Sequence, residues 1–296
     1  MDPRLADLAR LLELEQLEIN LFRGESRDIG APQVFGGQVL GQALTAASRT
    51  IEGRLVNSLH AYFLRRGDCK APIVYQVDRS LDGHSFSNRR VVAIQHGEQI
   101  FNMAASFHVS EPGLDHQISM PAVPPPEELA DSSLPPAELL ARMPERLRRF
   151  FEQPRPFEFR LVQPMDFLRP RKAPPERQIW FRSVGALPEG ERLHRCLLAY
   201  VSDFFLLDTA TLPHGTSFLT SPIVMASLDH AMWFHRPLRV DDWLLYAMES
   251  PSASGARGFA RASVFSREGR LVASTAQEGL VRLKQSSGSA QEKPAG

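Results

Sequence analysis

Cysteine is scarce in this chain, and its scarcity bears on the kinds of site to expect. Only Cys69 and Cys196 occur among the 296 residues, far apart and without the spacing of metal ligands. No disulfide framework or cysteine-based metal site is therefore expected. The simplest interpretation is a reducing compartment in which both thiols are small core or surface residues.

An excess of charge and long apolar runs are also missing. Thirty-four basic side chains balance thirty-four acidic ones, so no overall field attracts nucleic acid or an anionic membrane. No apolar run reaches about 18 residues, and the N-terminus lacks the apolar core of a signal peptide. The final Lys293-Pro294-Ala295-Gly296 is not a peroxisomal address of the Ser-Lys-Leu type. We expect a soluble cytoplasmic protein without membrane insertion or nucleic-acid partner.

Several catalytic motifs are absent as well. No Gly-x-Ser-x-Gly sequence occurs, which argues against a serine hydrolase. His230 and His235 have no H-E-x-x-H frame around them, so no metal is implied. Basic and aromatic residues at 142–151 lie in a proline-rich region, and they fit helix docking better than nucleic-acid binding.

The first half of the sequence predicts helices followed by an antiparallel meander. Residues 4–22 carry Leu and Ile at nearly helical spacing, which predicts a packing helix. Residues 34–48 combine small and apolar side chains, which predicts a helix buried on most sides. Strand-like segments follow at 55–65, 72–81, 85–95 and 99–109. Asp82-Gly83 and His96-Gly97 supply turns between them.

The second half repeats this order. Strands are predicted at 157–164 and 177–185, then a helix with an apolar stripe from Leu193 to Phe205. Further strands are predicted at 223–237, 242–252, 258–269 and 270–283. At one constant offset, matching pairs are Phe63 and Phe234, Arg65 and Arg236, and Tyr75 and Tyr246, with Gly97 and Gly269 after a one-residue slip. We infer an internal duplication.

The predicted fold is α+β, with two tandem units that each lay a curved antiparallel sheet against one long helix. Pairing the two sheets edge to edge would remove two exposed edges, and function is expected between the halves. We expect an N-terminal unit with a leading helix at 1–112 and a proline-rich linker with a short helix at 113–156. A C-terminal unit at 157–284 and a disordered polar tail at 285–296 complete the chain.

Three polar residues of the second half are candidates for chemistry. Asp203 falls at the border of the apolar stripe, where partial desolvation raises the pKa of a carboxyl group and makes it a better base. Position alone favours the alternative, an ordinary boundary Asp bonded to a loop backbone. Ser227 and Gln277 are set into mostly apolar faces of separate strands, where they either bind a water with Asp203 or form cross-strand hydrogen bonds.

Other candidates would recognise anionic groups. Gly36-Gly37 opens the first buried helix, so free amides there could polarise a carbonyl or hold an anion, although a tight turn is an alternative. Five arginines could meet the phosphates of a coenzyme, and solvated strand ends explain them as well: Arg65, Arg66, Arg236, Arg257 and Arg261.

Longer segments are similar to one known family. They are LFRGESRDIGAPQVFGGQVLGQAL, LHAYFLRRGD, DGHSFSNRRVVAIQ, LLAYVSDFFLL, LDHAMWFHRP, DDWLLYAMESPSASGARGFARA and LVASTAQEGLVR. These motifs, from about residue 12 to about 283, closely resemble the acyl-CoA thioesterase II family. The resemblance implies a double hotdog fold, hydrolysis of acyl-CoA to free acid and coenzyme A, and a homo-oligomer.

The resemblance also implies site residues. In that family an aspartate, a threonine or serine, and a glutamine hold the water, which places these roles at Asp203, Ser227 and Gln277. Relatives commonly carry threonine where this chain has Ser227. We therefore expect Asp203 to act as general base without a metal or cofactor, and an amide of Gly37 or Gln38 to stabilise the oxyanion.

Two other functions remain open at this point. A dehydratase acting on hydroxyacyl thioesters would need a His paired with a carboxylate, and His60 or His230 could serve. A non-catalytic acyl-CoA-binding protein is the second alternative, although the presence of all three polar residues argues against it.

Overall fold

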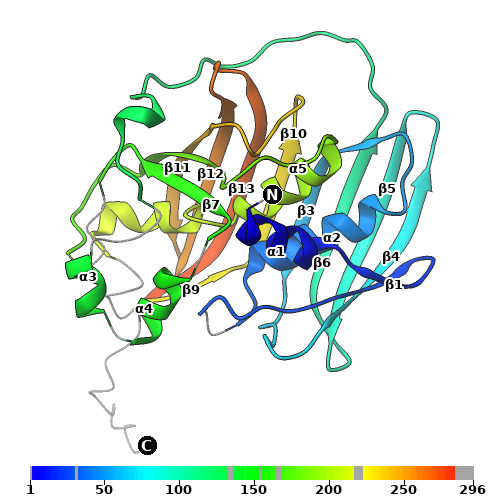
Figure 1. The fold of residues 1–296 in the computed structure, drawn as a ribbon, viewed down its shortest axis with the longest axis horizontal. Helices are drawn as coiled ribbons and strands as arrows, with labels where there is room; N and C mark the ends of the chain where they lie inside the picture. Colours follow the sequence, from blue (N-terminus) through cyan, green and yellow to red (C-terminus); the bar gives the residue numbers. More distant parts are fainter. Residues whose placement is uncertain are drawn as a thin grey trace, which may run out of the picture.

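One curved antiparallel sheet carries most of the protein (Figure 1). The computed structural model describes residues 2–30, 33–132, 137–143, 145–153, 155–164, 169–216 and 223–283. Within them the sheet has 13 strands, and no helix is long and apolar enough to cross a bilayer. The tail predicted at 285–296 lies outside the described residues.

The N-terminal half follows the predicted order after a correction at its start. Its elements are α1 (Pro3–Leu12), β1 (Glu15–Glu18), β2 (Leu21–Gly24), α2 (Gly36–Ser48), β3 (Leu55–Phe63), β4 (Ile73–Asp82), β5 (Phe86–Gln95) and β6 (Glu98–His108). The helix predicted for residues 4–22 ends at Leu12, because residues 15–18 pair with β2 instead. Leu17 and Ile19 are exposed in this hairpin, so their helical spacing was misleading.

The C-terminal half repeats the arrangement with two differences from expectation. Its elements are β7 (Phe157–Leu161), β8 (Glu176–Ser183), α5 (Glu191–Val201), the 3-10 segment η2 (Leu207–His214), β9 (Ile223–Ser227), β10 (Asp229–Phe234), β11 (Leu244–Ser254), β12 (Arg257–Ser266) and β13 (Leu271–Leu283). The helix predicted to reach Phe205 ends at Val201, and Phe205 has a left-handed φ of 66° that no helix continues. The strand predicted at 223–237 is divided at Leu228 into β9 and β10. Strand β9 pairs with β13, and strand β10 pairs with β13 and also with β3.

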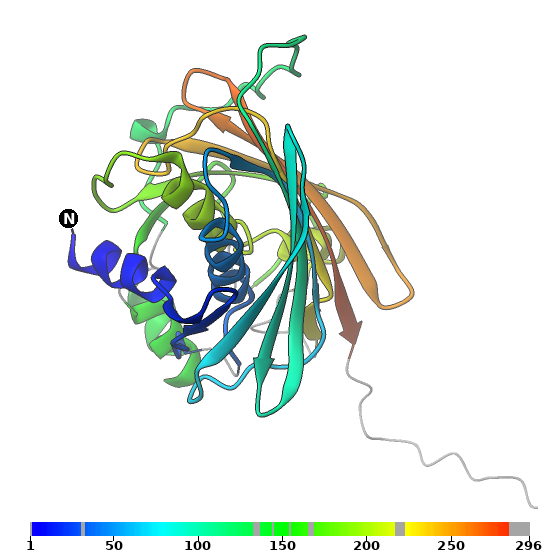
Figure 2. The same ribbon diagram turned by 90° about the vertical axis from the view of Figure 1, so that its right-hand side faces the viewer.

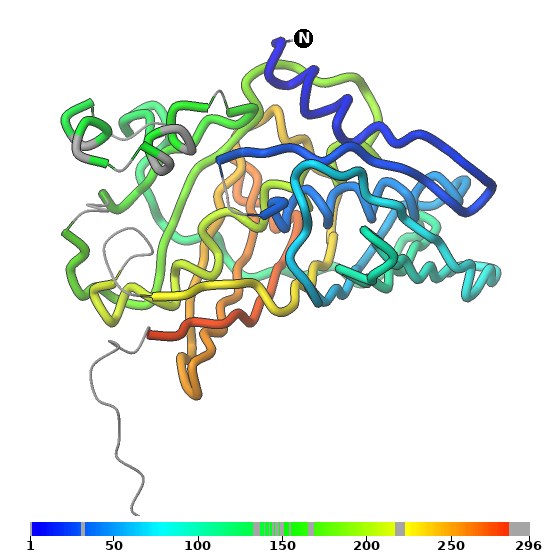
Figure 3. Tube along the Cα trace, turned by 90° about the horizontal axis from the view of Figure 1, so that it is seen from below, coloured from blue at the N-terminus to red at the C-terminus, as the bar shows by residue number. Residues whose placement is uncertain are grey.

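The two halves are joined through the sheet and have the same strand pairings. The order β1-β2-β4-β5-β6-β3 continues as β10-β13-β12-β11-β8-β7, so β3 and β10 are the central neighbours. Figure 3 shows the N-terminal half and the C-terminal half side by side. Tyr75 lies opposite Ala93, and Tyr246 lies opposite Val264, one constant offset further along the chain. This register supports the inferred duplication and the predicted edge-to-edge pairing.

Helices α2 and α5 lie side by side on the concave face of the sheet (Figure 2). Their contact depends on glycine, because a Cβ at Gly37 would overlap the Tyr200 carbonyl oxygen. A Cβ at Gly41 would stand 3.2 Å from the Cys196 oxygen. The prediction that α2 is buried on most sides is confirmed, since 11 of its residues are buried. This close approach brings the start of α2 to the end of α5.

The proline-rich linker packs on the outside of the C-terminal half. Its described elements are η1 (Pro126–Glu128), α3 (Ala137–Arg142) and α4 (Glu145–Glu152). Trp180 donates its indole N–H to the Pro124 oxygen at 2.9 Å. Trp180 also joins a small apolar cluster against which Met120 and Val123 pack. The linker therefore covers an apolar surface of the C-terminal half.

Candidate active site

Asp203 stands two residues beyond the last residue of α5, in the turn that leads to η2. Ser202 caps the helix, and its hydroxyl donates to the Ala199 oxygen at 2.9 Å. The sequence placed Asp203 on the helix itself, at the border of its apolar stripe. The turn instead directs the carboxylate towards the start of α2 and towards strands β9 and β13.

The structure brings the three polar candidates together. Gln277 on β13 donates from Nε2 to Asp203 Oδ1 at 2.8 Å. Ser227, the last residue of β9, donates to the same oxygen at 3.4 Å, which is a long and weak hydrogen bond. Both strands lie next to each other in the sheet, so their register fixes the two donors against one carboxylate oxygen.

Burial makes this carboxylate a base suited to neutral pH. Desolvation raises the pKa of Asp203 to about 6, and the negative charge of Asp208 also raises it. Hydrogen bonds from Gln277, from the Gly37 backbone N–H and from Ser227 stabilise the ionised form and limit the rise. Above about pH 6 the carboxylate is mostly ionised and can accept a proton, as general-base chemistry requires.

The first turn of α2 forms the other wall. The Gly37 backbone N–H is bonded to the Asp203 carboxylate, and the Gln38 N–H donates to the Phe35 oxygen at 3.0 Å. A Cβ at Gly36 would lie only 2.6 Å from Asp203 Oδ2. Glycine at position 36 therefore keeps open the face of the carboxylate that Gln277 and Ser227 do not contact.

Asp203 and Ser227 line a pocket of about 470 Å³ between the two halves. Its walls are largely apolar and aromatic, with Phe35, Val39, Phe63, Phe101, Phe204, Phe205, Leu207 and Met225 among the lining residues. Gln277 lies behind the pocket, with its side chain fully buried. The pocket is also lined by Asp208 of η2. This second carboxylate was not predicted from the sequence, although Asp208 closely follows the motif that contains Asp203.

The arginine candidates are separated, and Arg261 is paired with Glu249 at 2.6 Å, away from the pocket. Arg65 lines the pocket, donates to the Gln99 oxygen at 2.7 Å and pairs with Glu98 at 2.9 Å. Arg236 is paired with Asp115 of the linker, and Arg257 is paired with Glu278 at 2.9 Å. Neither Arg236 nor Arg257 is among the residues that line the pocket. Arg66, beside Arg65, lines it too.

The two histidines considered for a dehydratase do not face the pocket. His60 is exposed on the opposite face of the sheet, where its ring centroid lies 5.3 Å from that of Trp233. His230 is fully buried, and burial lowers its pKa to about 3, so the imidazole is neutral. No imidazole of the described residues therefore lines this pocket beside Asp203.

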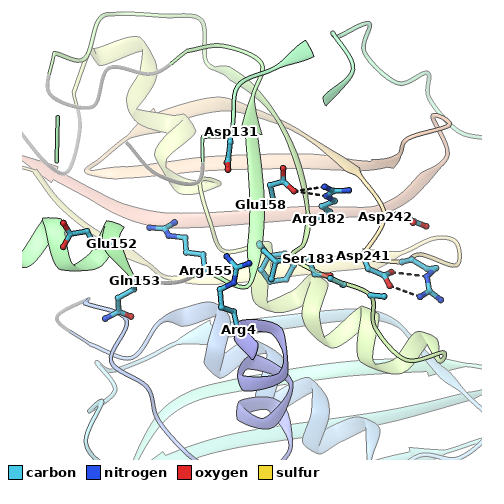
Figure 4. Close-up of a pocket in the computed structure, with 15 residues that line it drawn as sticks. Arg4, Asp131, Glu152, Gln153, Arg155, Glu158, Arg182, Ser183, Asp241 and Asp242 are labelled. Carbon is cyan, nitrogen blue, oxygen red and sulfur yellow. Dashed lines mark hydrogen bonds and ion pairs between the residues drawn. The ribbon is translucent and has the colours of Figure 1, made fainter. Parts of the chain in front are cut away.

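A second cavity, of about 720 Å³, lies near α1, α4 and strands β7 and β8 (Figure 4). Many of its polar side chains form ion pairs, including Arg182 with Glu158 at 2.9 Å and Arg239 with Asp241 at 2.8 Å (Figure 4). It is larger than the Asp203 pocket but has none of the three converging residues. Size alone therefore does not single out the candidate site.

Comparisons with known proteins identify the family. The acyl-CoA thioesterase family model matches residues 147–280, and the model of the acyl-CoA thioesterase N-terminal domain matches residues 23–108. Acyl-CoA thioesterase 2 of Haemophilus influenzae is 43% identical over 286 residues, which cover 96% of this chain and 100% of that protein. Human acyl-coenzyme A thioesterase 8 is 43% identical over 292 residues, covering 96% and 91% of the two chains.

Solved structures give the same assignment. An acyl-CoA thioesterase II, TesB2, of Mycobacterium marinum has a TM-score of 0.77 at 43% identity, covering 94% of this chain and 99% of its own. A hot dog fold protein of Alicyclobacillus acidocaldarius has a TM-score of 0.75 at 19% identity, covering 94% and 98%, which shows the fold alone. On these matches and motifs, the chain belongs to the acyl-CoA thioesterase II family.

Proposed function

We propose that this protein hydrolyses fatty acyl-CoA to a free fatty acid and coenzyme A, with Asp203 as general base. The observation that carries the proposal is the contact of Gln277 and Ser227 with one oxygen of Asp203, at an apolar pocket. An apolar pocket suits an acyl chain, and a carboxylate with a raised pKa suits activation of water. Acyl-CoA is also the substrate that the names of the relatives print.

The reaction follows from these positions. Asp203 accepts a proton from a water whose oxygen attacks the thioester carbonyl carbon, while Ser227 and Gln277 orient the carboxylate and the water. The tetrahedral oxyanion then collapses, the carbon–sulfur bond breaks, and the coenzyme A thiolate takes up the proton. The free acid and coenzyme A leave, with no covalent enzyme intermediate.

We assign oxyanion stabilisation to the start of α2, at the amide of Gly37. The Gln38 N–H, the other predicted donor, is already engaged with the Phe35 oxygen at 3.0 Å. The Gly37 N–H is bonded to the ionised Asp203. A protonated carboxyl is a weaker acceptor than a carboxylate, so proton transfer to Asp203 would free this amide for the oxyanion as the negative charge develops there. The two events would then occur in the same step.

Arg65 is proposed to meet a phosphate of coenzyme A, because it lines the pocket and retains partial exposure beside Glu98. Arg236 and Arg257 would serve only if coenzyme A extended to their ion pairs with Asp115 and Glu278. Comparing the Michaelis constants of Arg65→Ala, Arg236→Ala and Arg257→Ala for one acyl-CoA orders their contributions.

We also propose that the architecture is a double hotdog. Its repeats would be 1–112 and 157–284, joined by the linker at 113–156. The repeated strand pairings and the likeness to a hot dog fold structure support this proposal. Homo-oligomer formation and a cytoplasmic location stay predictions.

The test is thiol release from short, medium and long acyl-CoA, with decanoyl-CoA as the reference. Asp203→Asn keeps the size of the side chain and should lower kcat by about 100-fold to 10,000-fold, the usual contribution of a positioned general base. The matched control is Thr50→Val. Thr50 stands two residues beyond α2, as Asp203 stands two residues beyond α5, and this change should leave kcat unchanged. Equal turnover by wild type and Asp203→Asn would disprove the assignment.

The same assay distinguishes other functions. Hydration of an enoyl-CoA without release of a thiol would indicate a dehydratase. Tight binding of acyl-CoA without any turnover by the wild type would indicate a binding protein.

A further inference from the structure

His230 lies directly behind the candidate site without touching the pocket. It is on β10, its side chain is 0% exposed, and its Nε2 is 2.9 Å from the hydroxyl of Ser202. Ser202 immediately precedes Asp203 in the turn after α5. A contact with Ser202 is therefore a contact with the backbone that carries the proposed base.

The position of the proton on His230 follows from Ser202. The Ser202 hydroxyl oxygen is 2.9 Å from the Ala199 carbonyl oxygen, a hydrogen-bond distance, and 3.4 Å from Met232 Sδ, a much weaker acceptor. The carbonyl has no hydrogen to give, so we place the serine hydrogen on this bond. It follows that His230 Nε2 carries a proton and donates it to Ser202, and that the neutral ring has a bare lone pair at Nδ1.

Gln277 leaves a second bare acceptor nearby. Its Nε2 donates to Asp203, so its Oε1 points elsewhere, and its side chain is 0% exposed. Strands β10 and β13 pair Ala231 with Ala276, and continuing that register sets His230 opposite Gln277. Neither His230 Nδ1 nor Gln277 Oε1 has a hydrogen-bond partner among the described residues.

We propose that His230 is a positioning residue that orients both Asp203 and Gln277. On one side its Nε2–H holds Ser202, and thereby the turn of Asp203. On the other side, a buried water would donate one hydrogen to Nδ1 and one to Gln277 Oε1, since only a group with two hydrogens satisfies two acceptors. This bridge fixes the carboxamide with its NH₂ group towards Asp203, because a flipped amide would set an oxygen against the carboxylate.

The inference rests on the proposed function, and its test has a readout that needs no substrate. In ¹⁵N-histidine-labelled wild-type protein, NMR should show His230 as a neutral ring protonated at Nε2 and unprotonated at Nδ1. A ring protonated at Nδ1 would overturn the proposal even if the enzyme were active. An inactive wild type would instead overturn the proposed function and leave the tautomer as a separate result.

Kinetics supply the second arm. His230→Leu should lower kcat for decanoyl-CoA by about 10-fold to 100-fold, because the hydrogen bond of a misplaced Gln277 to the charged Asp203 would be weakened or lost. The Michaelis constant should change less than about threefold, because His230 does not line the pocket. His230→Gln, which can restore a donor towards Ser202 but has no acceptor at the Nδ1 position, should recover part of the loss.

The pH profile separates positioning from packing. The groups that face Asp203 are Gln277 from β13, Ser227 from β9, the Gly37 N–H from α2 and the charged Asp208 from η2. Gln277 lowers the pKa of Asp203, so misplacing Gln277 in His230→Leu should move the acid limb of kcat to higher pH. His230→Leu could instead change only the thermal stability, with kcat and the acid limb of its pH profile as in the wild type. His230 would then be a packing residue, and the proposal would be overturned.

Discussion

The two halves of this protein share their strand pairings but differ in the polar residues at equivalent positions. The equivalent pairs are Asp203 and Thr50, each two residues beyond its helix; Ser227 and Val56; Gln277 and Ala105; and Ala260 and Arg89. The first pair sets a carboxyl group against a hydroxyl group. In the second and third pairs only the C-terminal member is polar, and in the last pair only the N-terminal member is polar. One half therefore assembles a site around a carboxylate, and the other fills the same place with a guanidinium.

Arg89 occupies the N-terminal position completely. Its side chain is 1% exposed, and it donates to the Thr50 hydroxyl at 2.8 Å and to Asp82 at 2.6 Å. In the C-terminal half the small Ala260 stands opposite Gln277 and leaves room for its carboxamide. The two halves therefore fill equivalent positions differently, with a carboxylate and its two side-chain donors in one half and a buried guanidinium in the other.

The largest effect should come from removing this arginine. Arg89→Met deletes several buried hydrogen bonds, one of them to a carboxylate, so the free energy of unfolding should fall by about 3 kcal/mol. Thiol release at a temperature where the variant is folded should be unchanged. Urea unfolding measures the first quantity, and the exposed neighbour variant Arg90→Met is the control. A loss of activity in folded Arg89→Met would show that the N-terminal half takes part in the chemistry.

Glycine at the start of α2 is the next point at which the halves differ, since α5 starts with Glu191. Gly36→Ala puts a methyl group 2.6 Å from Asp203 Oδ2, so either the carboxylate or the helix must shift. Displacement by about 1 Å can cost 100-fold in rate, and we expect a fall in kcat of about that size. Glu191→Ala, at the matching helix start, should have wild-type kcat. Full activity in Gly36→Ala would mean that Oδ2 needs no open face.

Ser227 should contribute less, because its hydrogen bond to Asp203 is long at 3.4 Å. Ser227→Ala should lower kcat by about 10-fold or less, because so long a hydrogen bond is weak even when its acceptor is a carboxylate. Ser227→Thr restores the hydroxyl and should stay within about threefold of wild type. If Ser227→Ala lost as much activity as Asp203→Asn, the hydroxyl would have a role beyond orientation.

The smallest effect should come from Asp208, which has its strongest charge partner in Arg177. Asp208 raises the pKa of Asp203, so Asp208→Asn should lower that pKa and move the acid limb of kcat to lower pH. At pH 7 the rate should hardly change, because Asp203 is already mostly ionised there. A limb that moves to higher pH would contradict the electrostatic coupling.

Residue patterns predicted the strands better than the helix ends. Alternation over 55–109 located four strands, because one face of each strand packs on the core. Periodicity overran α1 and α5, since Leu17, Ile19, Phe204 and Phe205 continue a helical spacing in segments that are not helical. No Gly or Pro marks the end of either helix. The stop signals are a hairpin in one case and a left-handed Phe205 in the other.

The site could be predicted only in part. The spacing of apolar residues and the polarity of their neighbours selected Asp203, Ser227 and Gln277 as candidates. Their convergence, however, depends on the contact of α2 with α5 and on the register of β9 with β13. Only the family resemblance united them beforehand. The partner of Arg236 is Asp115, more than a hundred residues earlier in the chain. Local sequence could not show that this guanidinium was already paired.

The pH dependence of kcat for decanoyl-CoA tests the central claim most directly, because the base must be ionised to act. With the pKa of Asp203 raised to about 6 by burial, kcat should rise as pH increases through about 6 and then reach a plateau. The residual rate of Asp203→Asn should lack this limb. A wild-type kcat that stays flat between about pH 5 and about pH 8 would contradict the account.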